Sequence, residues 1–326
     1  MRRFVPTVAL ALLAAACSSE PMLASDLDPT TTTTSTATTA PTTTVMQVTT
    51  TSEEVGTNVS DILRIAYDEL LEFDSVNFAS HTDTQAGALG DARGSIAGRW
   101  NRDGTSELQI AVALDDRAVD VVELAVREDP AELAEAIATL ATGISYRFTA
   151  DGFAWITAGA GQKWQGGPKE SLPGALELEA STDAALYLDS LFTSIVEVSP
   201  DPDTDASGNE TYALVLDADI IVPALAPAST AGNLYDNGYD GVSEELTDGS
   251  ITLDADGALI AAFVDQTPWW VAGWNTVGIG GVTEGATVEW AIGVSASSEQ
   301  RPVVVPCDAP TNVFDADLGI DLLECA

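Results

Sequence analysis

The spacing of apolar residues predicts an amphipathic helix where the folded part of the chain begins. Between residues 59 and 73, apolar side chains recur every three or four positions, with charged residues between them. This spacing gathers them on one side of a helix. They are Val59, Ile62, Leu63, Ala66, Leu70 and Phe73. Asn58 and Ser60 are the two candidates for the residue that caps the start of this helix.

The period then changes from helical spacing to alternation, which predicts strands. Apolar residues alternate with polar ones over 94–101 and 106–114, as in half-buried strands. The segment 118–127 is predicted as a third strand. A second helix is predicted over 130–142, because proline occupies its first position and Gly143 follows its end.

Two Asp-Gly pairs predict hairpin turns farther along the chain. Asp151-Gly152 separates the apolar runs 144–149 and 153–158, and Asp256-Gly257 separates 250–253 from 259–266. The other predicted elements are a helix over 182–195, strands near Glu197, at 210–218 and at 286–295, and an extended segment over 301–306. A tryptophan-rich segment, 269–274, lies between two of the strands. Many consecutive antiparallel strands with a few helices predict one α+β domain over residues 58–306.

The first 16 residues have the three parts of a signal peptide. Arg2 and Arg3 precede a short apolar run over 5–13, and small residues follow it. The sequence Leu13-Ala14-Ala15-Ala16-Cys17 resembles the lipobox of bacterial lipoproteins, in which a peptidase cuts before a cysteine that then carries lipid. The resemblance implies a lipid anchor on Cys17, stable if it holds two or more acyl chains. The alternative is an ordinary secretory signal with an incidental cysteine.

Residues 17–57 are predicted to be a disordered linker that follows the lipidated cysteine. Threonine dominates this stretch, which has neither helical nor strand periodicity. Such a composition buries too little apolar surface to offset the entropy lost on ordering. We expect it to hold the folded domain away from the extracytoplasmic face of a bacterial membrane, in the cell envelope.

Charge and cysteine content narrow the possible partners and the compartment. The chain has 51 acidic and 12 basic residues, a charge that repels nucleic acid and anionic lipid headgroups. If Cys17 carries lipid, Cys307 and Cys325 remain as one pair, and in an oxidising compartment a disulfide between them is expected. It would pin the tail, residues 307–326, and would stabilise the fold by about 3 kcal/mol.

No catalytic or metal-binding pattern stands out in the sequence. His81 is the only histidine, and no recognisable nucleophile motif lies near it. Because the chain has one histidine and three cysteines, zinc sites built on several His or Cys ligands are excluded. The acidic stretch 201–210 lacks the glycine and glutamate positions of a calcium-binding EF-hand loop, and 236–241 has the composition of a turn. We therefore expect no enzyme activity, no cofactor and no metal.

The order of segments resembles the half-barrel lipoproteins related to the periplasmic carrier LolA and to the mycobacterial LppX and LprG group. The similarity covers roughly residues 58–306. It lies in the hairpin of residues 147–164, the central strand of 208–217, the Asp-x-x-Gly hairpin of 252–260 and a closing strand over 300–306. The tryptophan-rich segment 269–274 is an insertion-like departure from this pattern.

The resemblance implies a curved antiparallel sheet, a half-barrel, that wraps around a few helices and encloses an apolar cavity. Such a protein would bind or carry a lipid, a lipoprotein or another acylated ligand. The candidate cavity residues are Ile62, Leu63, Ala66, Leu70, Ile96, Leu108, Ile110 and Val112. For each of them plain core packing is the alternative. The alternative for the whole protein is a non-catalytic envelope module, structural or for interactions, whose core is filled.

Overall fold

The structure is a computed structural model that describes most of the chain from residue 59 onward. The described residues are 59–125, 130–158, 163–168, 184–225, 246–276, 281, 284–304, 306, 310–315 and 320–325. The predicted signal peptide, Cys17 and the linker lie outside them, as do Asn58, Cys307 and the turn at 236–241. The predictions made for those segments therefore stay predictions.

The described strands form one open antiparallel sheet, which confirms the predicted α+β class. Their order is β13-β14-β6-β5-β4-β3-β2-β1-β12-β11-β10-β9-β7, and the short β8 pairs with β9. The strands are β1 (Ser75–Gln85), β2 (Asp91–Asn101), β3 (Ser106–Leu114), β4 (Ile144–Phe148), β5 (Phe153–Ala158), β6 (Gln165–Pro168), β7 (Ile195–Val198), β8 (Asp203–Thr204), β9 (Glu210–Asp217), β10 (Leu246–Leu253), β11 (Leu259–Asp265), β12 (Thr287–Ser297), β13 (Thr311–Asp315) and β14 (Ile320–Glu324).

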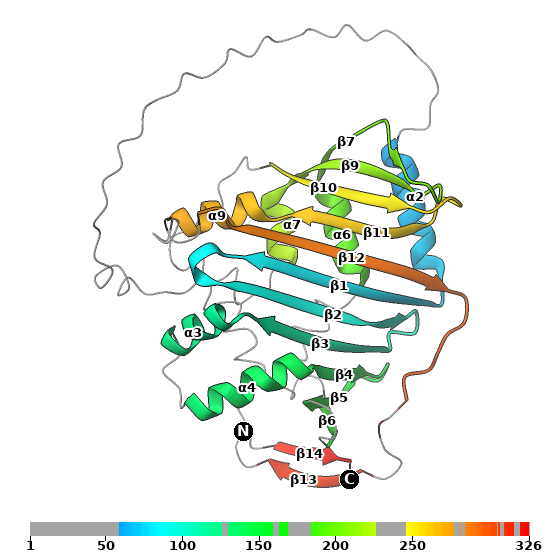
Figure 1. Cartoon of the computed structure of the whole chain (residues 1–326). Coiled ribbons are helices and arrows are strands. Elements are labelled where there is room, and N and C mark those ends of the chain that lie inside the picture. The colour runs from blue at the N-terminus through cyan, green and yellow to red at the C-terminus, as the bar shows by residue number, and fades with distance from the viewer. Residues whose placement is uncertain are drawn as a thin grey trace, which may run out of the picture.

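The middle of the sheet is formed by strands from opposite ends of the chain. β1 pairs along its whole length with β2 on one side and with β12 on the other, so that Ser75 lies opposite Ser297. One half of the sheet is the run β1 to β6, and the other half is the run β7 to β12 (Figure 1). The pairing of β1 with β12 joins the two halves into a single sheet.

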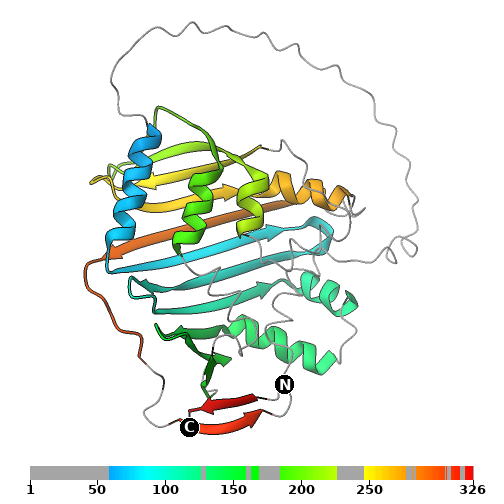
Figure 2. The same ribbon diagram turned by 180° about the vertical axis from the view of Figure 1, so that it is seen from behind.

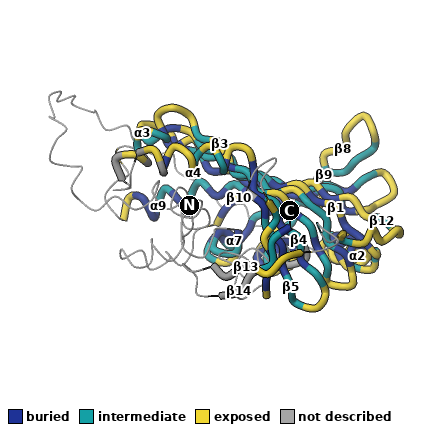
Figure 3. Tube along the Cα trace, turned by 90° about the horizontal axis from the view of Figure 1, so that it is seen from below, coloured by how far each residue is buried: buried dark blue, intermediate teal, exposed yellow. Residues whose placement is uncertain are grey.

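Helices cover one side of this sheet. The described helices are α2 (Val59–Glu72), α3 (Asp116–Ala125), α4 (Pro130–Thr142), α6 (Ala184–Ser194), α7 (Ala218–Leu225) and α9 (Thr267–Thr276), with a single 3-10 turn, η2 (Gly87–Leu89). Figure 2 shows α2, α6 and α7 in front of the half that contains β9 to β12. Burial is concentrated along the strands and on the inward sides of the helices, whereas the β8 hairpin is exposed (Figure 3). Within the described residues, no helix combines the length and the apolarity that a membrane crossing requires.

The strongest local signals in the sequence are confirmed. α2 and α4 occupy the predicted segments, and both Asp-Gly pairs lie in hairpin turns. α4 ends at Gly143, which has a φ of 92° and whose N–H donates to the carbonyl oxygen of Thr139 at 3.0 Å. This left-handed conformation costs glycine little, and it satisfies a carbonyl group at the helix end.

The strand predicted at 118–127 is wrong, because this segment contains helix α3. The carboxylate of Asp115 accepts a hydrogen bond of 2.6 Å from the backbone N–H of Ala118. This is the contact of a helix N-cap, and it satisfies a backbone donor that has no partner within the helix. The valines at 119, 121 and 122 favour strand locally, and the cap together with tertiary packing overrides that preference.

Three elements that belong to the core were not predicted from the sequence. β1 is the central strand, and α7 follows β9 directly, although Pro223 lies inside it. The tryptophan-rich segment lies in helix α9, and Trp269, Trp270 and Trp274 are buried in the core. The indole Nε1 of Trp269 donates to the carboxylate of Asp219 on α7 at 3.2 Å. α9 is therefore an integral part of the core.

The extended segment after β12 does not form the closing strand that the family resemblance implied. Residues 300–304, which we call the strap, have no regular secondary structure and lead from β12 toward the tail. The tail forms the β13–β14 hairpin, and β14 pairs with β6 at the edge of the sheet. The tail therefore extends the same sheet. Cys325 is buried, but Cys307 lies outside the described residues, so their pairing stays a prediction.

Candidate functional site: the apolar side of the sheet

The helix-facing side of the central strands carries no charged side chain. In β12, β1, β2, β3 and β4 the even-numbered positions share this side, since Phe78 lies opposite Val294 and Gly98, and Gly98 lies opposite Leu108. None of these even-numbered positions holds Asp, Glu, Lys or Arg. In a chain with 51 acidic residues this is a strict separation of charge. We call this surface the apolar side.

The opposite side of the same strands carries the charges. Asp83 forms ion pairs there with Arg93 at 3.3 Å and with His81 at 3.7 Å. Glu107 is 2.9 Å from Arg99 and 3.9 Å from Arg147. The single histidine is thus on a half-exposed outer surface, beside a carboxylate, and does not face the apolar side.

Two hydrophobic clusters lie on the apolar side. The first is formed by α2, α6, α7 and α9 against β9 to β12 and β1, and its fully buried members include Leu188, Leu216 and Trp269. The second is formed by α4 against β3, β4 and β5, with Leu140, Tyr146 and Phe148 at its centre. Burial raises the pKa of the Tyr146 hydroxyl, because the phenolate would lose its hydration.

The clusters meet at β2, where apolar residues are only half-buried. Ile96 packs against both clusters. Trp100 packs against the first and Ile110 against the second, and both are half-buried. We call Ile96, Trp100 and Ile110 the junction. It is the candidate binding site, because it combines half-buried apolar side chains with strand positions on the same side that hold no charged residue.

The predicted cavity residues divide between the two clusters. Leu63, Ala66 and Leu70 of α2 are buried in the first cluster, whereas Leu108 and Val112 of β3 are buried in the second. Of the remaining candidates, Ile96 and Ile110 belong to the junction and Ile62 is 36% exposed. The prediction that Ile62 lines a cavity is therefore wrong. Ile62 directly precedes the buried Leu63, and the helical rotation between neighbouring residues turns Ile62 away from the sheet.

Several important residues of the apolar side were missed. Phe78 lies on β1, where only two apolar residues alternate before the strand continues with Ser80, Thr82 and Thr84, so the apolar pattern is too short to predict a strand. Trp100 was placed in a strand but not in the site. The available signal was its position, four residues after Ile96 and therefore on the same side.

Comparisons with known proteins give a distant structural similarity only. No protein-family profile matches the chain, and no curated protein matches it in sequence. The crystal structure of LprF from Mycobacterium bovis is similar over 76% of this chain and 97% of the LprF chain, at 10% sequence identity and a TM-score of 0.42. At this level of similarity the match does not assign a ligand or an activity.

Proposed function

We propose that this protein is a lipid-anchored envelope protein that binds the acyl chains of a lipid, or another acylated ligand, on its apolar side. The observation that carries the proposal is the separation of charge across the central strands. A strongly acidic chain keeps one side of these strands free of charged groups, and at the junction that side is not completely buried.

The driving force for such binding is the removal of apolar surface from water. It contributes roughly 25 cal/mol for each Å² of apolar surface that becomes buried. Ile96, Trp100 and Ile110 are half-buried and can bury further surface against a ligand, whereas charged groups on this side would oppose an acyl chain. Ligand sites are typically concave and mostly apolar, with few polar groups.

The location follows from the N-terminal sequence. A signal peptide over residues 1–16 would direct export, and acylation of Cys17 would attach the protein to the outer face of a membrane. The linker to residue 57 would set the distance between that membrane and the folded part. A Cys307–Cys325 disulfide would fit the oxidising compartment that export implies.

A second candidate function is a non-catalytic envelope module that binds no lipid. It is favoured by the completeness of the first cluster, in which Leu63, Leu188, Leu191 and Leu216 have no exposed surface. In that case the junction residues are half-buried only because they lie where two packed clusters meet, and no ligand covers them.

Native mass spectrometry separates the two functions. The full chain with Cys17→Ser lacks the predicted acylation site, so any lipid that it carries must be bound non-covalently. The binding function predicts adducts whose mass matches a lipid and which disappear on denaturation. Repeated spectra of the bare polypeptide, from gently purified samples, would favour the filled module.

The anchor is tested separately by cell fractionation. We expect the wild-type protein to sediment with membranes and Cys17→Ser to be released, because a single substitution removes the attachment point. Cys325→Ser is the control, since it changes a cysteine that has no predicted role in attachment. If Cys17→Ser still sediments with membranes, the lipoprotein assignment is wrong.

A further inference from the structure

One row of residues across the sheet contains an unfilled position between the two clusters. Thr82 of β1 lies opposite Trp290 of β12 on one side and opposite Gly94 of β2 on the other. Gly94 in turn lies opposite Val112 of β3. All four residues are on the apolar side, and the row therefore crosses from the first cluster to the second.

The two ends of this row are buried, whereas the two residues in its middle are half-buried. Trp290 is 3% exposed and its ring lies 6.0 Å from that of Tyr187 on α6. Val112 is 4% exposed and belongs to the cluster beneath α4. Thr82 and Gly94, between them, are half-buried. A Cβ atom added at Gly94 would have no atom of the described residues within 4 Å, its chain neighbours apart.

The space at Gly94 is a property of this position and not of the glycines of β2 in general. Gly98 is on the same strand and the same side, but a Cβ there would lie 2.2 Å from the carbonyl oxygen of Glu107. Gly98 is therefore required by the close approach of β3 (Ser106–Leu114). No such contact requires glycine at residue 94, yet glycine keeps open the space beside Ile96 of the junction.

We propose that the acyl chain of the bound lipid enters the apolar side over Gly94 and runs along β2 past Ile96 toward Trp100. This inference rests on the proposed function and specifies the path of the ligand. The six residue-to-residue steps from Gly94 to Trp100 span about 20 Å at roughly 3.4 Å per step, a length comparable with an extended fatty acyl chain. An uncharged hydrocarbon is the occupant that matches a path without a charged side chain.

The direction of the chain follows from the side chains at the two ends. Near Gly94, Thr82 and Thr84 are half-buried and can offer hydroxyl groups to a polar headgroup. At the other end Phe78 is 5% exposed and Trp100 packs against the first cluster, so that end is closed by aromatic side chains. The headgroup therefore lies at Thr82 and Thr84, and the methyl end of the chain lies near Trp100.

A side chain introduced at residue 94 tests this path. The parent protein is the full chain with Cys17→Ser, and the probe is an uncharged pyrene-labelled monoacylglycerol titrated while its fluorescence is recorded. We expect Gly94→Leu to weaken binding of the probe at least tenfold, because its side chain fills the opening. The matched control is Ala97→Leu, which adds the same side chain to the exposed outer side of the same strand. Its affinity should equal that of the parent.

The outcomes distinguish the path from the function. If the parent and both variants bind the probe equally, acyl chains enter elsewhere and the path is wrong while lipid binding stands. If the parent binds neither the probe nor any co-purified lipid, the proposed function itself fails. If native mass spectra of the parent instead show a dimer that Gly94→Leu dissociates, the site is occupied by a second copy of the chain, and the path is again wrong.

A second measurement does not depend on a bulky substitution being tolerated. An uncharged monoacylglycerol with a diazirine on its alkyl chain is bound to the parent protein and activated by light. The path predicts adducts on peptides that contain residues 94–100 and 76–84. Adducts confined to other strands would overturn it, whatever the stability of Gly94→Leu.

Discussion

At the scale of single residues, two glycines on one side of β2 have opposite surroundings. The added Cβ at Gly98 would lie 2.2 Å from a backbone oxygen and 2.8 Å from the Cα atom of Leu108, whereas that at Gly94 would meet no atom of another described segment within 4 Å. Backbone atoms cannot rotate away as the end of a side chain can. The same substitution is therefore expected to have different effects four residues apart.

We predict that Gly98→Ala destabilises the fold by about 1–3 kcal/mol, the usual cost of forcing extra atoms into a packed site. Gly94→Ala should leave the free energy of unfolding unchanged or raise it by up to about 1 kcal/mol, because alanine reduces the freedom of the unfolded chain. Urea unfolding, followed by tryptophan fluorescence, measures both. Equal loss in the two variants would show that residue 94 is packed after all.

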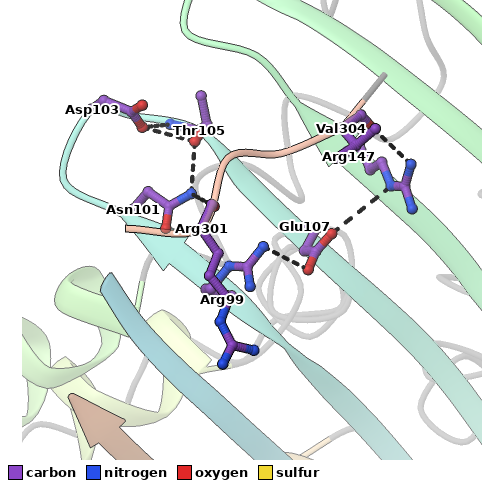
Figure 4. Close-up of polar contacts among 8 residues, drawn as sticks. All are labelled: Arg99, Asn101, Asp103, Thr105, Glu107, Arg147, Arg301 and Val304. Carbon is purple, nitrogen blue, oxygen red and sulfur yellow. Dashed lines mark hydrogen bonds and ion pairs between the residues drawn. The ribbon is translucent and has the colours of Figure 1, made fainter. Parts of the chain in front are cut away.

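At the scale of elements, the strap links the two halves of the sheet through a few polar contacts (Figure 4). The side chain of Asn101 on β2 donates to the carbonyl oxygen of Arg301 at 2.9 Å, and Gln300 contacts Asp103. The guanidinium of Arg147 on β4 donates to the carbonyl oxygen of Val304 at 2.6 Å. The strap thus runs from β12 to β4 alongside strands to which it has no ladder of backbone hydrogen bonds.

Arg147 also connects the strap with the tail. Its guanidinium lies 4.8 Å from the centre of the Trp164 ring, and the carbonyl oxygen of Trp164 accepts a hydrogen bond from the N–H of Cys325 at 2.9 Å. Beside it, Lys163 pairs with Glu324 at 2.6 Å. The tail hairpin pairs with β6 at two residues only, so these contacts contribute much of its attachment.

We predict that Arg147→Ala loosens the tail hairpin while the central strands stay protected. Amide hydrogen exchange should become faster in 311–315 and 320–324 and remain slow in β1 (Ser75–Gln85) and β12 (Thr287–Ser297). The control is Arg93→Ala, which removes an exposed ion pair on the same outer side. Faster exchange throughout the sheet would mean that Arg147 stabilises the whole fold rather than this attachment.

The sequence predicted elements whose signals are local. α2, α4 and the two Asp-Gly hairpins depend on periodicity, caps and turns, all of which are contained in short segments. α3, α7 and α9 were missed because valines, a proline and clustered tryptophans disfavour or obscure a helix locally, whereas tertiary packing decides the outcome. β1 was missed because serine and threonine occupy most of its inward-facing positions, so the apolar alternation is short. Its strand conformation is fixed by pairing with its two neighbours in the sheet.

The candidate site was predictable in part for the same reason. The sequence identified Ile96 and Ile110 as inward-facing, because alternation alone decides that. It could not show that α2 and α4 serve separate clusters, since this depends on where β1 and β12 meet. Nor could it distinguish Gly94 from Gly98, because the difference is made by the approach of a neighbouring strand.

At the scale of the whole molecule, the net charge of −39 must oppose compaction. We predict that stability rises as NaCl is increased from 0.01 to 0.1 M, because the screening length falls from about 30 to about 10 Å. The midpoint of urea unfolding measures this, and KCl should act equally if screening is the cause. A midpoint that does not change would mean that the carboxylates repel one another as strongly in the unfolded chain.

Because β1 pairs with β12, the sheet cannot be completed until residues 287–297 are available. Hydrogen-bonding groups along one edge of β1 acquire their partners only from residues 287–297, close to the end of the chain. During synthesis or transport, the strands that form first therefore leave the backbone N–H and C=O groups along this edge of β1 without partners. Such an exposed edge can pair with the wrong strand. Contacts so distant in sequence form slowly. A truncated chain that ends before residue 287 would lack the β1–β12 pairing, and the exposed edge of β1 would make it prone to aggregate.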